Sequence, residues 1–420
     1  MSSWKLLSIG HRYRRLELQL IMKFAVCRRY LPWRILTLLV IIGTLTVFGL
    51  LTVRSDDYAT AKLDNSIEPY WLDNLRNISS FSAVISKNSK YLFFSSELLT
   101  QNISKYEQGW FRNVSEENYL AANLSVFEKG NTIKNRLNDS YLIMGDNVCK
   151  GVQPFLLVII PSVASNTAER DAIRWTWLRA AETNSWPRAF IRDHIKHIFL
   201  FGRQDSQRNK DYEQLLHESN IVGDIVMADF EDTYRNLTRK VLSGLSWVRQ
   251  YCPQAEFVLK ADQDTFINVP LMLEVIHKAA TQLKNASFVM GLQHNHEQPL
   301  VVRSGRWAVS EEEYPLEFYP HYLLGHTYVL SRQAVVDIIS TAPYVALISP
   351  EDAYITGILP KVAGVLRITA KSFAISIDRR YVCVVVWNMK VAVPEVKRPS
   401  LLANLWANII THQCNDSFYN

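Results

Sequence analysis

The sequence predicts an α/β protein in which helices flank a mostly parallel central sheet, behind an N-terminal transmembrane helix and a stem. Three observations predict this arrangement. Residues 35–53 form an uncharged apolar run. From residue 154 onward, short apolar runs that suit buried parallel strands alternate with amphipathic helical patterns. An acidic triplet, Asp262-Gln263-Asp264, directly follows one of these expected strands.

The apolar run from Ile35 to Val53 would extend roughly 28 Å as a helix, which is enough to span a bilayer. Eight Lys and Arg residues precede it against Glu17 alone, so the N-terminus is expected in the cytosol. A cleaved signal peptide is the alternative, but its apolar region is normally shorter, and no small-residue cleavage site follows near Leu51. The sequence therefore predicts a cytosolic tail at 1–34 and an uncleaved signal anchor at 35–53.

The charge of the chain is concentrated in that tail. The tail has a net charge of +7, and the whole chain has a net charge of +6. The residues after the anchor therefore carry a net charge of about −1. A folded body with this charge lacks the basic footprint of a nucleic-acid-binding protein, so no nucleic-acid partner is expected. A hydrophobic content of 48% excludes a chain that is disordered throughout.

Residues 54–150 are rich in Asn, Ser and charged side chains and show little periodicity, as expected of a stem that holds the next domain away from the membrane. Glycosylation sequons are much denser in this segment than after it, which favours a glycoprotein with a lumenal body. The sequons lie at Asn77, Asn102, Asn113, Asn123, Asn138, Asn236, Asn285 and Asn415.

Four cysteines follow the anchor: Cys149, Cys252, Cys383 and Cys414. An even number could form two disulfides in an oxidising compartment. Three pairings are possible, and the alternative is that some of these residues are buried free thiols.

Residues 151–420 are expected to form the catalytic domain. The patterns predict strands at 155–160, 197–201, 221–228 and 256–260. They also predict a helix from Ala168 to Ala181, with Thr167 as its N-cap and with Ile173 and Trp177 on the core face, and a further helix from about Leu237. Alternating strands and helices favour parallel pairing, and ligands of such sheets bind beyond the carboxyl ends of the strands.

The acidic triplet falls at such a strand end. Asp262 and Asp264 supply hard oxygen ligands, which suit Mg²⁺ or Mn²⁺ when substrate phosphate and water complete the coordination shell. A nucleotide-sugar donor needs such a cation, because its leaving group is a nucleoside diphosphate whose developing charge must be neutralised. The alternative is an ordinary acidic turn, but the strand-like residues on both sides favour a metal site.

Several motifs together resemble the β-1,3-galactosyltransferase family, which includes β-1,3-N-acetylglucosaminyltransferases, over roughly residues 155–364. The main ones are at 170–177 (RDAIRWTW), 229–240 (DFEDTYRNLTRK), 260–266 (KADQDTF) and 351–354 (EDAY). Between the last two, the segments at 306–310, 313–315, 319–322 and 325–331 also resemble the family's central block.

This resemblance implies a GT-A type fold and a single-pass type II protein of the Golgi membrane. The implied reaction is an inverting β-1,3 transfer of galactose or N-acetylglucosamine from a UDP-sugar to a glycan acceptor, with Mn²⁺ (or Mg²⁺) as cofactor. Association with itself or with other glycosyltransferases is also possible. Asp262 and Asp264 would bind the metal and Asp262 and Gln263 the donor. The family commonly has Asp at position 263, so altered affinity is expected there, because Gln keeps an acceptor oxygen without the charge.

Asp352 is the expected catalytic base, from the resemblance of residues 351–354 to the family's Glu-Asp-Val-Tyr element. An inverting displacement needs one carboxylate on the acceptor side to take the hydroxyl proton. Glu351 is the local alternative, and either acid could instead merely stabilise a helix N-terminus after Pro350. The glycine that follows this element, Gly357, is displaced by one residue from the family's register.

Arg170 and Arg174, at the start of the helix after the first strand, are expected to bind the donor phosphates. For Arg174 the alternatives are a solvated helix face and an ion pair with Asp232. Lys240 and Lys260 could likewise form structural ion pairs, and neither is included in the predicted site.

Trp307, Tyr314 and Tyr322 are expected to contact the acceptor sugar, and the alternative is that they pack a loop against the sheet.

A second function class is a catalytically silent relative that serves as a lumenal binding or chaperone-like partner of another glycosyltransferase. Gln263 and Ala353 are its only support, and the retained aspartates oppose it. A metal-dependent phosphohydrolase is a third class, but the sequence lacks the additional carboxylate and histidine clusters that a two-metal site requires.

Overall fold

The computed structural model describes residues 111–113, 120, 127, 129–137, 140–203, 209–284, 286–294, 297–373 and 390–412. All of them belong to the second of two compact units, which runs from Leu92 to Asn420. The expected tail, the signal anchor, Cys383 and Cys414 lie outside these ranges. Within them, none of the helices combines the length and hydropathy that a bilayer span requires.

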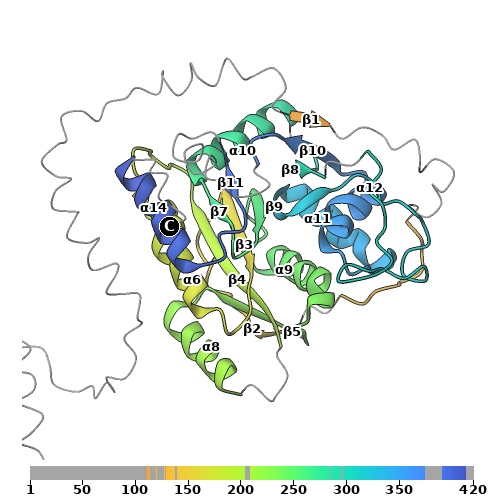
Figure 1. Cartoon of the computed structure of the whole chain (residues 1–420), viewed down its shortest axis with the longest axis horizontal. Helices are drawn as coiled ribbons and strands as arrows, with labels where there is room; N and C mark the ends of the chain where they lie inside the picture. The colour runs from red at the N-terminus through yellow and green to blue at the C-terminus, as the bar shows by residue number, and fades with distance from the viewer. Residues whose placement is uncertain are drawn as a thin grey trace, which may run out of the picture. The chain divides into compact units, whose positions relative to one another are not determined.

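A nine-stranded sheet forms the centre of the unit, in the order β1-β10-β8-β9-β6-β3-β4-β5-β2 (Figure 1). Six strands run in one direction, and β1, β2 and β9 run against them. The predicted α/β sheet is confirmed, but half of its pairings are antiparallel, partly because β9 inserts between β6 and β8. In sheet order the strands are Phe111–Asn113, Leu366–Ala370, Phe288–Gln293, Leu323–Ser331, Phe257–Ala261, Leu156–Pro161, Ile195–Arg203, Ile225–Glu231 and Tyr141–Ile143.

Strand β3 forms where the sequence is apolar without interruption. Every residue of β3 is buried, as expected of a parallel strand that is covered on both faces. The predicted strand at 221–228 begins only at Ile225, because Ile221 and Val222 complete helix α8, Asn209–Val222. Gly223, with a φ of 77°, then ends that helix in the left-handed conformation that glycine tolerates.

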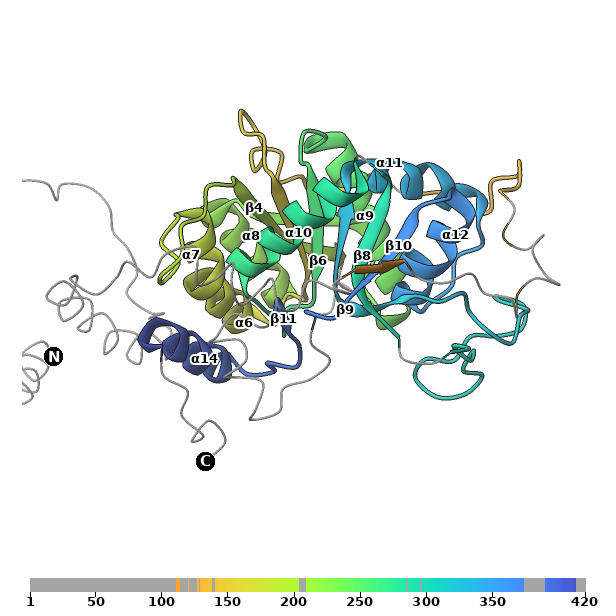
Figure 2. The ribbon, with the colours of Figure 1, turned by 90° about the horizontal axis from the view of Figure 1, so that it is seen from above.

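Helices cover both faces of the sheet (Figures 1 and 2). One face packs against α6 (Thr167–Ile173), α8, α10 (Val269–Leu283) and α14 (Pro399–Thr411). The other face packs against α9 (Leu237–Tyr251), α11 (Arg332–Thr341) and α12 (Leu359–Ala363). Successive β3 residues alternate between the two cores, with Val158 in the first and Ile159 in the second. The result is a three-layered α/β/α unit.

The helix predicted at 168–181 is present but is not one continuous α-helix. It consists of α6, the π-helix η3 (Arg174–Leu178) and α7 (Arg179–Glu182). Thr167 is its first helical residue and not its N-cap, which is Asn166 without a capping side-chain bond. Ile173 and Trp177 lie in the core, as predicted.

Part of the segment expected to be a stem belongs to the folded unit. Strand β1 pairs with β10 at one edge of the sheet, and β2 pairs with β5 at the other. Cys149 forms a disulfide with Cys252 at the end of α9, so one of the two expected disulfides is present. The folded unit therefore begins before residue 151.

Several short elements complete the described part of the unit. Strand β7 (Phe266–Ile267) pairs with β11 (Ala392–Val393). The 3₁₀-helix η5 (Tyr234–Asn236) precedes α9, η6 (Ala342–Tyr344) follows α11, and the π-helix η7 (Ala353–Ile358) precedes α12.

Candidate active site

The acidic triplet forms a tight turn after β6, held from two sides. The Asp262 N–H donates to the His326 carbonyl of β9 at 3.0 Å, and the Thr265 N–H donates to the Asp262 carbonyl at 3.0 Å. The Asp264 carbonyl accepts from the Val396 N–H at 2.7 Å, so the segment after β11 fixes the far side of the turn. Both carboxylates are thus placed by backbone hydrogen bonds at the carboxyl end of a central strand.

The two carboxylates of the triplet fit a divalent cation. The Asp262 side chain is 40% exposed, and one of its oxygens pairs with Lys260. Burial and the neighbouring Asp262 raise the pKa of Asp264, so a cation would relieve the repulsion between them. The described residues hold no group of three or more His, Cys, Asp or Glu side chains arranged for a metal. A cation held by these two carboxylates alone would need substrate phosphate and water to complete its coordination shell.

Lys260 joins the triplet to the residues of the second acidic motif. Its fully buried ammonium donates to Asp262 Oδ1 at 2.6 Å and to the Gly325 carbonyl at 2.5 Å, and it lies 3.5 Å from Glu351 Oε2. Although burial lowers the pKa of Lys260, Asp262 and Glu351 raise it above its usual value. The sequence interpretation as an ion pair was correct, but the pair lies inside the candidate site.

Glu351 and Asp352 differ in their surroundings. Glu351 is buried and accepts a hydrogen bond from the Tyr328 hydroxyl, and burial raises its pKa to about 7. Asp352 lies beside it, and its Oδ1 accepts from the Ala353 N–H at 2.9 Å. Glu351 is thus committed to internal partners, which leaves Asp352 as the better candidate for contact with a substrate.

Gly325 of β9 lies against both acids. A Cβ atom at Gly325 would lie 3.2 Å from Asp352 Cβ, 3.3 Å from Glu351 Oε2 and 3.4 Å from Asp352 Oδ2. Burial raises the pKa of Asp352, the Ala353 N–H and Lys260 lower it, and Asp262 raises it further. Lys260 therefore links Asp262 to the segment that carries Glu351 and Asp352, and Asp264 lies two residues beyond Asp262 in the same turn.

The aromatic residues predicted for the acceptor fall into different environments. Tyr322 precedes Leu323, whose N–H donates to Thr356 Oγ1 at 2.8 Å, and that hydroxyl donates to the Asp352 carbonyl at 2.6 Å. Burial and the charge of Asp352 raise the pKa of the Tyr322 phenol. Tyr314 is buried, and its hydroxyl donates to the Phe318 carbonyl at 3.0 Å, so it packs the loop, which is the alternative reading. Trp307 is an exposed side chain on the same loop.

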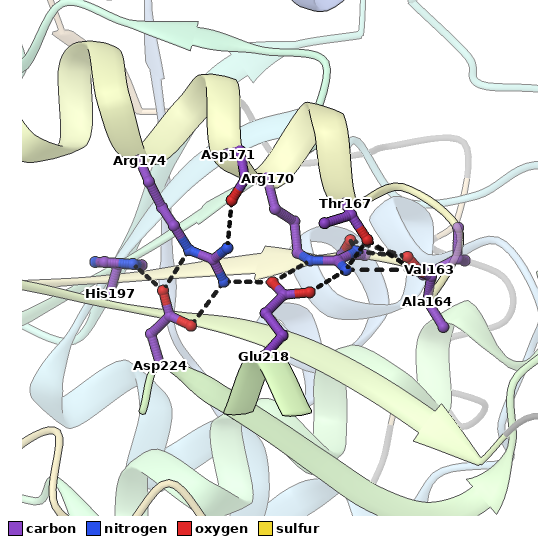
Figure 3. A network of polar contacts seen from close by, with 10 residues as sticks. Val163, Ala164, Thr167, Arg170, Asp171, Arg174, His197, Glu218 and Asp224 are labelled. Carbon is purple, nitrogen blue, oxygen red and sulfur yellow. Dashed lines mark hydrogen bonds and ion pairs between the residues drawn. The ribbon is translucent and has the colours of Figure 1, made fainter. Parts of the chain in front are cut away.

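Arg170 lies in a buried network (Figure 3). Its fully buried guanidinium is bonded in two places to the carboxylate of Glu218, at 2.6 and 2.8 Å. Its other N–H groups donate to Ser162 Oγ, Thr167 Oγ1 and the carbonyls of Val163 and Ala164. Since protein acceptors occupy all of its donors, this side chain offers none to a donor phosphate.

Arg174 lies in the same network. It forms a bidentate pair with Asp224, at 2.7 and 2.8 Å, and further pairs with Asp171 and Glu218. The ion pair with Asp232 that the sequence suggested as an alternative is wrong, because Asp232 pairs with Lys240 at 2.7 Å. Both arginines connect the helix formed by α6 and η3 to α8 and to the residue before β5. They are therefore not part of the proposed donor site.

Two polar groups at the triplet lack partners among the described residues: Gln263 Oε1 and both ring nitrogens of His326. Burial and Lys260 lower the pKa of His326 to about 4, although Asp262 opposes this, so the ring is neutral. A neutral imidazole can donate one hydrogen bond and accept another. No sequence pattern indicated His326, because its relation to Asp262 depends on the β6–β9 pairing.

Comparisons with known proteins point to one family. A galactosyltransferase family model matches residues 168–371. The chain is 33% identical over 233 residues to β-1,3-galactosyltransferase 5 of Pan troglodytes, a match that covers 55% of this chain and 74% of the relative. It is 27% identical over 242 residues to lactosylceramide 1,3-N-acetyl-β-D-glucosaminyltransferase A of Xenopus laevis, covering 57% and 62% of the two chains. A solved galactosyltransferase LgtC with donor and acceptor sugar analogues is 8% identical, covers 60% of this chain and 95% of that chain, and gives a TM-score of 0.29.

Proposed function

Because the chain belongs to the β-1,3-galactosyltransferase family and is therefore a β-1,3-hexosyltransferase, we propose that it transfers galactose or N-acetylglucosamine from a UDP-sugar to the 3-hydroxyl of a glycan acceptor. Mn²⁺ or Mg²⁺ is the proposed cofactor. The observation that supports the proposal is the Lys260 ammonium, which contacts Asp262 on one side and Glu351, next to Asp352, on the other. This contact supports a site in which the proposed metal ligands, Asp262 and Asp264, lie near a separate carboxylate, Asp352.

In the proposed mechanism, Asp262 and Asp264 would hold the cation, which when bound would supply positive charge to the diphosphate leaving group. Asp352 accepts the proton of the acceptor 3-hydroxyl as that oxygen bonds to the anomeric carbon and the bond to UDP breaks. One displacement of this kind inverts the anomeric configuration. Lys260 orients Asp262 toward the donor and offsets the negative charge of Glu351, so that Asp352 is the carboxylate left to act as base.

Both donor sugars remain in the proposal because relatives with both kinds of name match the chain. A GT-A type fold, in the sense the family implies, is compatible with the mixed sheet and with the acidic turn at the end of β6. A single-pass type II protein of the Golgi membrane, with its catalytic unit in the lumen, is supported by the disulfide between Cys149 and Cys252, since such bonds persist in oxidising compartments.

The test is a donor and acceptor array with the unit from Leu92 to Asn420, supplied with Mn²⁺ and either UDP-galactose or UDP-N-acetylglucosamine. Asp352→Asn should lose about 10²–10⁴-fold in transfer while it still binds UDP. Asp264→Asn should lose both transfer and Mn²⁺-dependent UDP binding. Asp193→Asn, which alters a partly buried carboxylate paired with His277, is the matched control.

Two outcomes would reject the proposal. Equal transfer by the wild type and Asp352→Asn would remove Asp352 from its role. A folded wild type that neither transfers nor hydrolyses any UDP-sugar would favour the alternative of a catalytically silent partner protein.

A further inference from the structure

Two exposed aromatic side chains lie against each other on the surface. Trp307 is 59% exposed and Tyr234 is 47% exposed. The indole N–H of Trp307 donates to the Tyr234 hydroxyl at 2.8 Å, and the Arg306 guanidinium lies 4.1 Å from the centre of the Tyr234 ring. Each polar tip is thus bound within the pair, which leaves the exposed surface of both rings largely apolar.

Tyr234 belongs to a segment that is anchored near the proposed base. It lies in η5, just beyond the carboxyl end of β5, and β5 shares its direction with β6. One helical turn later, the Thr238 hydroxyl donates to the Ser349 carbonyl at 2.9 Å, three residues before Asp352. This bond ties the start of α9 to the segment that carries the base.

Trp307 belongs to a second segment that is also anchored near Asp352. It lies in the loop of residues 297–322, which projects from the sheet (Figure 2). The loop ends at Tyr322, and the next residue, Leu323, donates its N–H to Thr356 Oγ1 at 2.8 Å. That hydroxyl in turn donates to the Asp352 carbonyl at 2.6 Å. The aromatic pair is therefore built from two segments, each of which is tied by hydrogen bonds to the chain around Asp352.

The loop that carries Trp307 is braced internally. The Arg303 guanidinium donates to the carbonyls of Val309, Tyr314 and Leu316 at 2.7–3.0 Å. These bonds fix the loop on either side of Trp307, so binding to its ring would cost little ordering of the chain.

We infer that Trp307 and Tyr234 form a second acceptor subsite, which binds the sugar ring next to the one that accepts the transfer. The inference rests on the proposed function and narrows its acceptor class to glycans of at least two rings. A pyranose presents an apolar C–H face that an aromatic ring can cover, and an exposed, fixed aromatic surface beside a reaction centre suits such a contact. The bound group is expected to be a sugar because the aromatic pair is connected to the segment of Asp352, and Asp352 is proposed to act on the accepting sugar ring.

The test compares acceptors that differ by one ring: N-acetyllactosamine against methyl β-galactoside, and chitobiose against methyl β-N-acetylglucosaminide. Trp307→Ala should lower kcat/KM for the two-ring acceptors about fivefold to tenfold and leave the one-ring values within about twofold. Tyr234→Phe, which removes the acceptor of the indole hydrogen bond, should give a smaller loss of the same kind. Trp175→Ala is the matched control, because Trp175 is also an exposed tryptophan, at 48%, with the Arg179 guanidinium 4.7 Å from its ring centre.

A loss of the same size for one-ring and two-ring acceptors would overturn the inference, as would an equal two-ring loss in Trp175→Ala. A second measurement separates this failure from failure of the proposed function. The indole N–H NMR signal of Trp307, assigned by its absence in Trp307→Phe, should shift on addition of N-acetyllactosamine or chitobiose even if no sugar is transferred. No shift with either disaccharide at millimolar concentration refutes the subsite.

Discussion

Removal of the charge on His197 tests the buried network of Figure 3. The ring nitrogens of His197 lie 2.7 Å from Glu182 Oε1 and 2.9 Å from Asp224 Oδ2, and Asp224 also holds Arg174. Burial alone would lower the pKa of His197, but the hydrogen bonds to Asp224 and Glu182 raise it from 6.5 to about 9. The imidazole is therefore protonated in the folded protein at neutral pH.

The direction and size of the effect follow from this difference. Because the folded-state pKa lies above the unfolded-state value, the proton on His197 stabilises the fold fully below pH 6.5. That contribution declines as the pH rises and is lost once the pH passes about 9. A pKa difference of this size corresponds to about 3 kcal/mol in the free energy of unfolding.

The assay is urea unfolding of the unit from Leu92 to Asn420 at pH 6, 7.5 and 9.5, for the wild type and for His197→Gln. The stability advantage of the wild type should shrink by about 3 kcal/mol between the lowest and highest pH. His277→Gln is the control, since His277 also pairs with a carboxylate, Asp193, but its side chain is 52% exposed and such pairs contribute little. Curves for the wild type and His197→Gln that stay parallel across this range would refute the reasoning.

Three further changes test the site and the frame around it. Lys260→Met should lower the free energy of unfolding by about 3–5 kcal/mol, because it leaves buried carboxylate without its cation, and should also weaken Mn²⁺-dependent UDP binding. Lys240→Met removes an equally buried lysine and should lower stability alone, so a change in Mn²⁺ response from Lys240→Met would contradict this assignment. Gly325→Ala should reduce kcat roughly tenfold by displacing Asp352, whereas Gly130→Ala, where nothing lies within 4 Å, should leave kcat unchanged in the same transfer assay. Replacement of both Cys149 and Cys252 by Ala should lower the free energy of unfolding by about 2–5 kcal/mol, because the disulfide closes a loop across a separation of 103 residues; unchanged urea midpoints would exclude that contribution.

The central strands could be predicted because burial on both faces favours an apolar run, which is unbroken in β3 and interrupted only by Lys260 in β6. The position of β9 could not. Its sequence resembles the other strands, and only the assembled sheet shows that it lies between β6 and β8 in the opposite direction. His326 and Gly325 lie near the acidic residues only because β9 pairs with β6. The sequence alone therefore could not predict their part in the site.

The two arginines show a different limit. An arginine near a helix start is the same local pattern whether it faces a phosphate or an internal carboxylate. The partners that decide between these, Glu218 and Asp224, lie 48 and 50 residues further along the chain. Similarly, Lys260 reaches Glu351 only after the chain has folded back.

The displaced glycine of the second acidic motif has a structural counterpart. The segment from Ala353 to Ile358, which contains Gly357, is a π-helix. A π-helix is the form an α-helix takes when it holds one additional residue in a turn, and such turns are frequent at functional sites. The shifted glycine indicated an extra residue, but the sequence could not predict that this residue would be accommodated as a π-helix directly after Asp352.

Both outermost strands of the sheet come from polypeptide that precedes the first core strand, β1 at one rim and β2 at the other. Proteolysis between Asn113 and Tyr141 would separate β1 from a released enzyme and leave β10 with a row of unpaired amides and carbonyls. Exposed rows of this kind template association between chains. A secreted or recombinant form that stays monomeric must therefore retain the chain from upstream of Phe111, even though the acidic motifs all lie more than a hundred residues later.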